Sequence, residues 1–271
     1  MLGAITLTRS GELVVHTYTA PDEGWCVNSH IVETASGLVV VDAQYTLTYA
    51  REVVAYAATL GKPIKRLYVT HYHPDHLLGA PAFSSPIHAL ASVAAKIDAV
   101  GDRVAAEEHA KLGDVVPIRA ERPSRIVAPG IEKLDGVRFE FLHLQQAETQ
   151  DALMIGLPDH GILITQDLIY NGVHVFMGER AFDSWAAALQ RTQALNYDTL
   201  LPGHGEPGGP ELYAAMSNYL GVAREELAAS NNGAELKARL VAAFPDHRAR
   251  ELLDHQMRFL FPQAANAASA L

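Results

Sequence analysis

The stretch YVTHYHPDH at residues 68–76 places four side chains that can bind metal within six residues. It includes and follows β-branched and aromatic residues typical of a strand. In an extended or tightly turned backbone alternate side chains point the same way, so His71 and His73 can converge on one point. Asp75 and His76 are then aimed at a second point. The stretch therefore predicts a turn that carries ligands for two neighbouring metal ions.

A strand, a helix and a second strand lead into this turn, which is the pattern of a βαβ unit. Residues 37–41 are a continuous apolar run that ends at Asp42, residues 47–60 have helical apolar spacing, and residues 64–69 are the second strand. Polar groups at the carboxyl ends of buried strands face the crevice in which α/β proteins bind ligands. We therefore expect Asp42 beside the histidine-rich turn, where it either orients a ligand histidine or caps the strand end.

The second half of the chain repeats this theme. Residues 161–166 are a mostly apolar run followed by Asp167, an arrangement that echoes the first strand and Asp42. A short last strand, residues 199–202, leads into Gly203-His204-Gly205. Two strand-rich halves flanked by helices are indicated. Further strands are expected over residues 4–8, 12–19, 28–33, 137–144 and 152–157, and further helices over residues 89–100, 103–112 and 181–195.

The composition of the 271-residue chain indicates an ordered protein with a substantial core, since 49% of its residues are apolar and 19% are charged. We expect one α/β domain over residues 1–210 and a helical extension over residues 211–271. The extension has mixed polar and apolar faces, which favours packing on the domain or against a second subunit in a homo-oligomer. Its helices are expected over residues 211–230, 234–243 and 248–261.

The charge and hydrophobicity of the sequence limit the classes of partner that we expect. The formal net charge is −10 and no cluster of Lys and Arg stands out, so nucleic acid is not an expected partner. Residues 1–10 lack a basic stretch followed by a long apolar segment, and no apolar run reaches the roughly 18 residues of a membrane span. Cys26 is the only cysteine, which excludes an internal disulfide. We expect a cytoplasmic protein without a membrane partner.

The pattern HxHxDH at residues 71–76, followed by an acid after a buried strand and then Gly-His-Gly, resembles the metallo-β-lactamase superfamily of metallohydrolases. The resemblance covers roughly residues 10–210. It implies an α/β fold, a four-layer αββα sandwich, with two divalent metal ions at one edge of the paired sheets. We expect zinc, with manganese or iron as alternatives. By motif, the first metal would be bound by His71 and His73, the second by Asp75, His76 and His204, and both by a bridging Asp167.

The chain departs from the family at one ligand. The family usually supplies a further histidine in a Gly-His-Thr or Ala-His-Thr turn, where this chain has Ala147-Glu148-Thr149. Glu148 is a competent ligand, and a similar Thr-Glu-Ala-Pro turn supplies a metal-binding glutamate in the alkylsulfatase branch of the family. His143 is the alternative, but it lies within the preceding strand. We therefore favour Glu148.

The resemblance implies a dinuclear metal-dependent hydrolase of a small ester, lactone, thioester or sulfate ester. Hydroxide generated between the metals would attack, and Asp75 would accept and donate the proton. Tyr170, Asn171 and His174 follow Asp167 in the sequence, so each is a candidate to bind substrate or to serve a structural role. The alternative is a metal-binding member with little hydrolytic activity, in a redox or scaffold role, if Glu148 impairs the first site. The acidic charge disfavours a nuclease.

Overall fold

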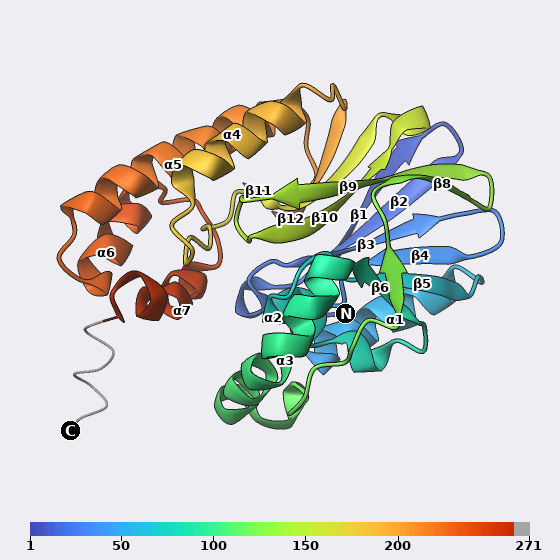
Figure 1. Ribbon diagram of the computed structural model, residues 1–271, viewed down its shortest axis with the longest axis horizontal. Helices are drawn as coiled ribbons and strands as arrows, with labels where there is room; N and C mark the ends of the chain where they lie inside the picture. Colours follow the sequence, from blue (N-terminus) through green and yellow to red (C-terminus); the bar gives the residue numbers. More distant parts are fainter. Residues whose placement is uncertain (263–271) are drawn as a thin grey trace.

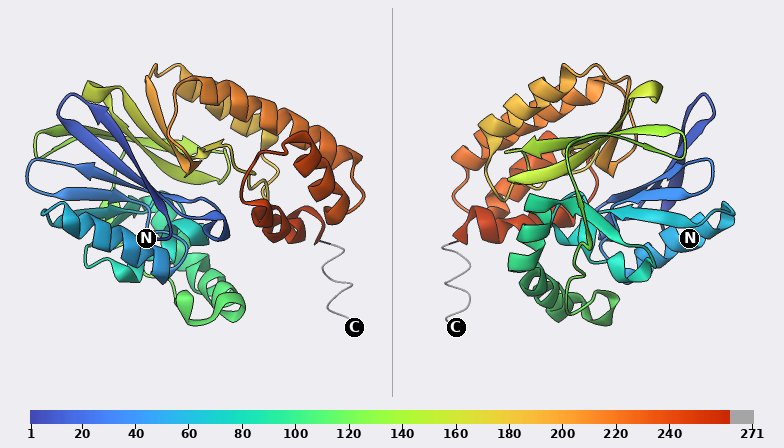
Figure 2. Two further views of the ribbon diagram at one scale, coloured as in Figure 1. Left: turned by 180° about the vertical axis from the view of Figure 1, so that it is seen from behind. Right: turned by 45° about the vertical axis from the view of Figure 1, so that its right-hand side comes forward.

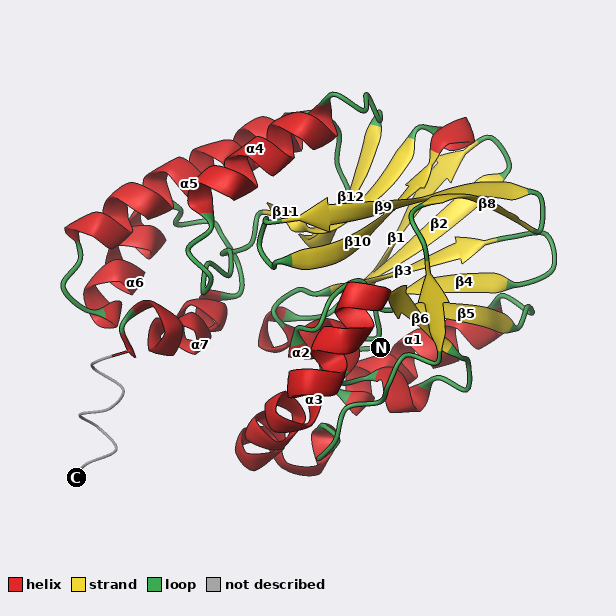
Figure 3. Cartoon of the chain, viewed as in Figure 1, coloured by secondary structure: helices red, strands yellow, loops and turns green. Residues whose placement is uncertain are grey.

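Two β-sheets form the middle of the molecule, and helices cover their outer faces (Figures 1 and 3). The computed structural model describes residues 1–262. The first sheet has the order β1 (Ala4–Ser10), β2 (Leu13–Thr19), β3 (Asn28–Glu33), β4 (Leu38–Val41), β5 (Ile64–Tyr68), β6 (Ile87–Leu90) and β7 (Arg125–Val127). The second has the order β12 (Thr199–Gly205), β11 (Ile162–Asn171), β10 (Asp151–Leu157), β9 (Val137–Gln145) and β8 (Gly130–Leu134). This arrangement confirms the expected αββα sandwich.

Each sheet combines an antiparallel part with a parallel part. Strands β1 to β4 are antiparallel, whereas β4, β5, β6 and β7 run parallel. Parallel neighbours need a crossover connection, and helices α1 (Leu47–Thr59) and α3 (Ala91–Leu112) provide two of them. In the second sheet only β11 and β12 are parallel, and α4 (Phe182–Gln193) connects them. The parallel strands bring Asp42, the histidine-rich turn, Asp167 and His204 to one edge of the sandwich.

Helix α1 shows why the local sequence folds as it does. Thr46 caps its first turn by accepting a hydrogen bond from the Tyr49 backbone, which satisfies one of the free N–H groups there. The helix buries Ala50, Val53 and Ala57, three residues spaced at helical intervals. These side chains pack in the same apolar cluster as the inner faces of both sheets.

The first helix of the helical extension packs on the outer face of the second sheet, and the other two helices lie beyond the end of that sheet (Figures 1 and 2). It consists of α5 (Glu211–Ala229), α6 (Gly233–Ala243) and α7 (Arg250–Leu260). Helix α5 contacts α4 and β11, and Arg248 at the start of α7 pairs with Asp22 of the first sheet's β2–β3 connection at 2.5 Å. The expected extension includes residues 263–271, which lie outside the described residues. Within residues 1–262 no helix is long and apolar enough to cross a membrane.

One predicted break and several boundaries are wrong. Residues 91–112 form a single helix, although a break was expected at Gly101. Gly101 is buried, and a Cβ atom there would lie 3.0 Å from the Ala120 Cβ, so this glycine serves close packing rather than a turn. Residues 87–90 are strand β6 rather than helix start. Strands β7 and β8 and the short helix α2 (Pro74–Leu77) were not predicted.

Candidate metal centre

Seven buried side chains meet at the edge of the sandwich. The turn after β5 and helix α2 supply four of them, the turn after β9 supplies Glu148, β11 supplies Asp167 and β12 supplies His204. Their relative exposures lie between 0% for His71 and 8% for His73. So many ionisable groups are not buried together without compensating partners.

The donor atoms of these side chains form two groups. The first ligand group is His71, His73, Glu148 and Asp167, and the second is Asp75, His76 and His204. Within each group one donor atom from every residue lies within 4.8 Å of the others. Since the two groups match the two expected metal sites residue by residue, the donor set fits divalent metal ions.

Asp167 lies between the two groups. Its Oδ1 is 3.1 Å from His76 Nε2, and its Oδ2 is 3.3 Å from His204 Nε2. The same Oδ2 is 3.7 Å from His71 Nε2 in the first group. One carboxylate therefore faces imidazoles of both groups, which is the geometry that a bridging ligand requires.

Unpaired buried atoms point to a missing partner in the first group. His71 Nε2, both carboxylate oxygens of Glu148 and Asp167 Oδ1 have no hydrogen-bond partner among the described residues. Glu148 Oε1 lies 2.9 Å from His73 Nδ1, without the alignment of a hydrogen bond. Leaving such atoms unsatisfied is costly, and a cation would satisfy them together. The residues present therefore fit a bound metal.

The charges of the cluster depend on each other. Burial raises the pKa of Glu148, while the pKa of Asp167 is held well below its usual range, because the charges of His76 and His204 outweigh the effect of burial. Asp75 behaves like Asp167: burial alone would raise its pKa, but the same two histidines lower it. Asp75 and Asp167 are therefore carboxylates at neutral pH, ready to bind cations.

Glu148 rather than His143 reaches the first group. The turn that carries Glu148 is closed by hydrogen bonds from Gln146 N to Gln150 O and from Ala147 N to Thr149 O. His143 lies on β9, with Nε2 2.6 Å from Asp151 Oδ1, and belongs to neither ligand group. The geometry thus supports the choice made from the sequence.

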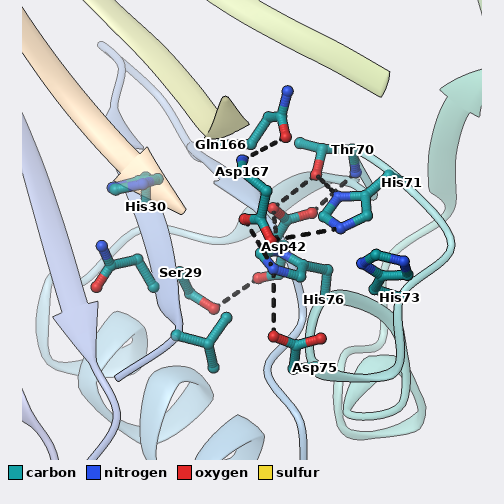
Figure 4. Close-up of polar contacts among 12 residues, drawn as sticks. Ser29, His30, Asp42, Thr70, His71, His73, Asp75, His76, Gln166 and Asp167 are labelled. Atoms are coloured by element: carbon teal, nitrogen blue, oxygen red, sulfur yellow. Dashed lines mark hydrogen bonds and ion pairs between the residues drawn. The ribbon is translucent and has the colours of Figure 1, made fainter. Parts of the chain in front are cut away.

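Asp42 is linked by hydrogen bonds to a histidine of the second ligand group and, through Thr70, to a histidine of the first (Figure 4). Its Oδ2 accepts hydrogen bonds from His76 Nδ1 and from Thr70 Oγ1, each at 2.8 Å, and its Oδ1 accepts one from Thr70 N. Thr70 Oγ1 also lies 3.0 Å from His71 Nδ1. Asp42 thus orients His76 of the second group directly and His71 of the first group through Thr70, and it caps the strand end as well. Thr70 was not identified from the sequence, although it directly precedes the HxHxDH motif.

Replacing Asp42 by asparagine is expected to weaken metal binding about 10–100-fold, because an amide cannot accept hydrogen bonds at both ends. Competition with a chromophoric chelator measures this affinity. Asp135→Asn is the control, since Asp135 makes comparable hydrogen bonds to Ser36 and Lys65 at the surface. An affinity within twofold of the parent chain would show that Asp42 only caps the strand.

Two glycines explain the Gly-His-Gly sequence around His204. A Cβ atom on Gly203 would lie 1.9 Å from Asp167 Oδ1, so only glycine lets β12 approach the Asp167 carboxylate. Gly205 has a φ of +83° and similarly close contact with Asn171 O. His204 itself is held through Nδ1, which lies 2.8 Å from Trp25 O, leaving Nε2 to face Asp75 and Asp167.

The three candidate substrate-binding residues lie in different places. Tyr170 lines the cavity beside the ligands, donates a hydrogen bond to Asp167 Oδ2 at 2.6 Å and stacks on His204 at 4.4 Å. Asn171 and His174 do not line that cavity, so their expected position beside the metals is wrong. Asn171 Nδ2 donates to Glu206 O, and His174 is fully buried with Nδ1 3.0 Å from Tyr219 OH. Strand β11 runs on to Asn171, and the chain reaches the cavity again only at Phe176.

A cavity of about 190 Å³ opens over the ligands. His73, Asp75, Glu148, Asp167 and Tyr170 form its floor. Its walls come from α3, from α7, from Trp25 and from the segment after β11, including Phe176 and Glu179. The contributions of α3 and α7 were not predicted, because no local motif marks them.

The matching family model is described as metallo-beta-lactamase superfamily and covers residues 24–204. A linear primary-alkylsulfatase from Pseudomonas sp. (strain ATCC 19151) is 29% identical over 220 residues, which are 65% of this chain and 41% of that protein. The chain thus spans less than half the length of this curated relative. Among solved structures, a metallo-beta-lactamase from Pontibacter korlensis has a TM-score of 0.61 and 23% identity, over 80% of this chain and 99% of that one. The DIM-1 metallo-beta-lactamase has a TM-score of 0.59 and 18% identity, over 81% of this chain and 98% of that chain. At these identities the two structures support the fold alone.

Proposed function

The chain belongs to the metallo-beta-lactamase superfamily, and on this basis we propose that it is a dinuclear metal-dependent hydrolase of a small ester-type substrate. The observation that carries the proposal is the pair of buried ligand groups sharing Asp167 on the floor of one cavity. The substrate class we propose is an ester, lactone, thioester or sulfate ester. A sulfate ester is included because the curated relative is a linear primary-alkylsulfatase.

Zinc is the metal we propose, because four of the seven ligand side chains are imidazoles. The three carboxylates keep manganese and iron as alternatives, since harder oxygen ligands suit them. Two bound divalent ions would supply Lewis-acid polarisation of the ester group and hydroxide at neutral pH. A cytoplasmic location is part of the same proposal, supported by the use of a single cysteine.

The side chains of the site have separate tasks. Asp75 lines the cavity and is a carboxylate at neutral pH, so it can accept a proton from the attacking water and return it to the leaving group. Its Oδ2 stays 3.2 Å from His204 Nε2, which fixes its orientation. Tyr170 holds Asp167 through its hydroxyl. Trp25 and Phe176 form apolar walls that reduce the access of bulk water.

The chain loaded with Zn²⁺ is expected to hydrolyse at least one member of a panel of short esters, lactones, thioesters and sulfate esters. A chelator should abolish the turnover, and Zn²⁺ should restore it. Initial rates with Zn²⁺, Mn²⁺ and Fe²⁺ in turn provide the measurement, with Asp75→Asn as the inactive control that retains its metal-binding oxygen. No turnover with any of the three metals would favour the second candidate, a metal-binding protein without hydrolytic activity.

A further inference from the structure

One wall of the cavity carries a cation that the hydrolytic steps do not use. Arg258 extends from α7 into the space above the ligands, opposite the α3 side chains that line the same cavity. We propose that Arg258 binds an anionic group of the substrate, which makes the substrate a short ester that bears a carboxylate away from the scissile bond. This inference rests on the proposed function and narrows its substrate class.

The N–H donors of the Arg258 guanidinium are only weakly used by other residues. Its two terminal nitrogens lie 3.4 Å from Glu107 Oε2 and 3.7 Å from Glu108 Oε1, which are loose pairings. Both acids have nearer partners, because Arg103 lies 2.9 Å from Glu107 and Lys111 lies 2.6 Å from Glu108. Arg258 Nε is buried and has no hydrogen-bond partner within the described part of the chain. A planar guanidinium with free donors matches a carboxylate in two-point contact.

An apolar surface lies between the ligands and this cation. The ring of Phe176 is 5.1 Å from that of His73 and 5.7 Å from that of Phe259. Arg258 in turn places its guanidinium carbon 4.6 Å from the centre of the Phe259 ring. A substrate with its ester over the metals and its anion at Arg258 would therefore lay its hydrocarbon part along Phe176 and Phe259.

The size of the cavity limits the length of that hydrocarbon part. Its volume of about 190 Å³ is below the roughly 300–1,000 Å³ of pockets that enclose drug-sized ligands. A chain of a few carbon atoms is thus the substrate that can reach the metal ligands and Arg258 together.

The charges around the cavity leave Arg258 available to bind an anion. The three ligand carboxylates and the hydroxide of the proposed function would balance two divalent cations, so the floor of the loaded site would be near neutral. Burial lowers the pKa of His255 to about 4, which leaves Arg258 as the α7 cation facing the cavity at neutral pH. Three acids, Glu107, Glu108 and Glu179, also line the cavity. Glu107 is paired with Arg103 and Glu108 with Lys111, while Glu179 is exposed, so that solvent screens its charge.

The test compares glutarate with valerate, two five-carbon acids of which only glutarate has a second carboxylate. Calorimetric titration of the Zn²⁺-loaded chain is expected to give glutarate an affinity about tenfold higher than valerate, through the Arg258 contact. Arg258→Gln should remove this preference and Arg258→Lys should keep part of it. Arg250→Gln is the matched control, because Arg250 is on the same helix and does not line the cavity. Its preference should equal that of the parent chain.

The kinetic arm uses mono-4-nitrophenyl glutarate and 4-nitrophenyl valerate. Arg258→Gln should lower the ratio of their kcat/KM values about tenfold, mainly by raising KM for the anionic ester. The binding arm needs no turnover, so a glutarate preference without hydrolysis would end the hydrolase proposal and support the anion site. A parent chain without the preference, or Arg258→Gln retaining it, would overturn the inference. Should Arg258→Gln not fold, an unchanged preference in Arg258→Lys would overturn it and a reduced one would support it.

Discussion

Replacing Asp167 by asparagine is expected to remove metal from both ligand groups and to lower hydrolysis at least about 1,000-fold. Asp167 faces His71 of the first group as well as His76 and His204 of the second. The amide keeps the shape of the side chain but loses its charge and one of its two acceptor oxygens. The site then has one negative charge fewer to balance two cations. The effect should exceed the 10–100-fold loss of affinity or activity that follows from changing an outer partner of a ligand.

Metal content after gel filtration, measured by mass spectrometry, and the rate on the best ester of the panel provide the measurement. Thermal unfolding adds a second readout, since Zn²⁺ at about 100 times its Kd should stabilise the parent chain by about 2.7 kcal/mol for each occupied site. Asp167→Asn should lose most of this stabilisation. Asp159→Asn, a change in a surface turn where the acid pairs with Arg138, should keep all of it. Two tightly bound metals in Asp167→Asn would show that the carboxylate does not bridge them.

The second large effect concerns Glu148. Glu148→Ala is expected to reduce the metal content toward about one ion per chain and the rate at least about 100-fold, because His71 and His73 then share only the Asp167 carboxylate, which also faces the second group. Glu148→His should restore metal binding, since imidazole is the ligand that the family usually places at this turn. The two variants together separate loss of a ligand from damage to the fold.

His143→Ala is the matched control for Glu148→Ala. His143 pairs with Asp151 on the surface of β9 and belongs to neither ligand group, so its removal should leave metal content and rate within twofold of the parent chain. If only His143→Ala strips the first metal, the assignment of Glu148 is wrong.

The site could largely be predicted because its ligands sit at local landmarks. His71, His73 and His76 are close in sequence, and His204 is marked by flanking glycines. Asp167 was expected at a strand end, whereas β11 in fact runs through it to Asn171, with register shifts between Gln166 and Tyr170. Asp167 lies within this irregularly paired part of the strand, and its carboxylate faces imidazoles of both ligand groups. The hydrophobic periodicity and the composition of a segment predict where a strand starts better than how far it extends.

The rest of the cavity depends on contacts that no local pattern encodes. Arg258 and Glu107 lie 151 positions apart and meet only because α7 lies across the cavity from α3. His174 shows the opposite error: closeness to Asp167 in sequence suggested a place in the site, but its side chain is buried against Tyr219, outside the cavity. Gly101 indicated a turn, yet helix packing against Ala120 decided its role. Tertiary packing overrides local signals in each case.

The proposed function requires that the two ligand groups bind two metal ions joined by Asp167, with Glu148 as a ligand of the first. Anomalous diffraction from crystals of the Zn²⁺-loaded chain, with elemental analysis of the same sample, would locate both ions. We predict two peaks, one within about 2.0–2.2 Å of donors of the first group, Glu148 included, and one at the same distance from the second group. Asp167 should contact both. A single peak, or two peaks with Glu148 turned away from the metal, would contradict the account.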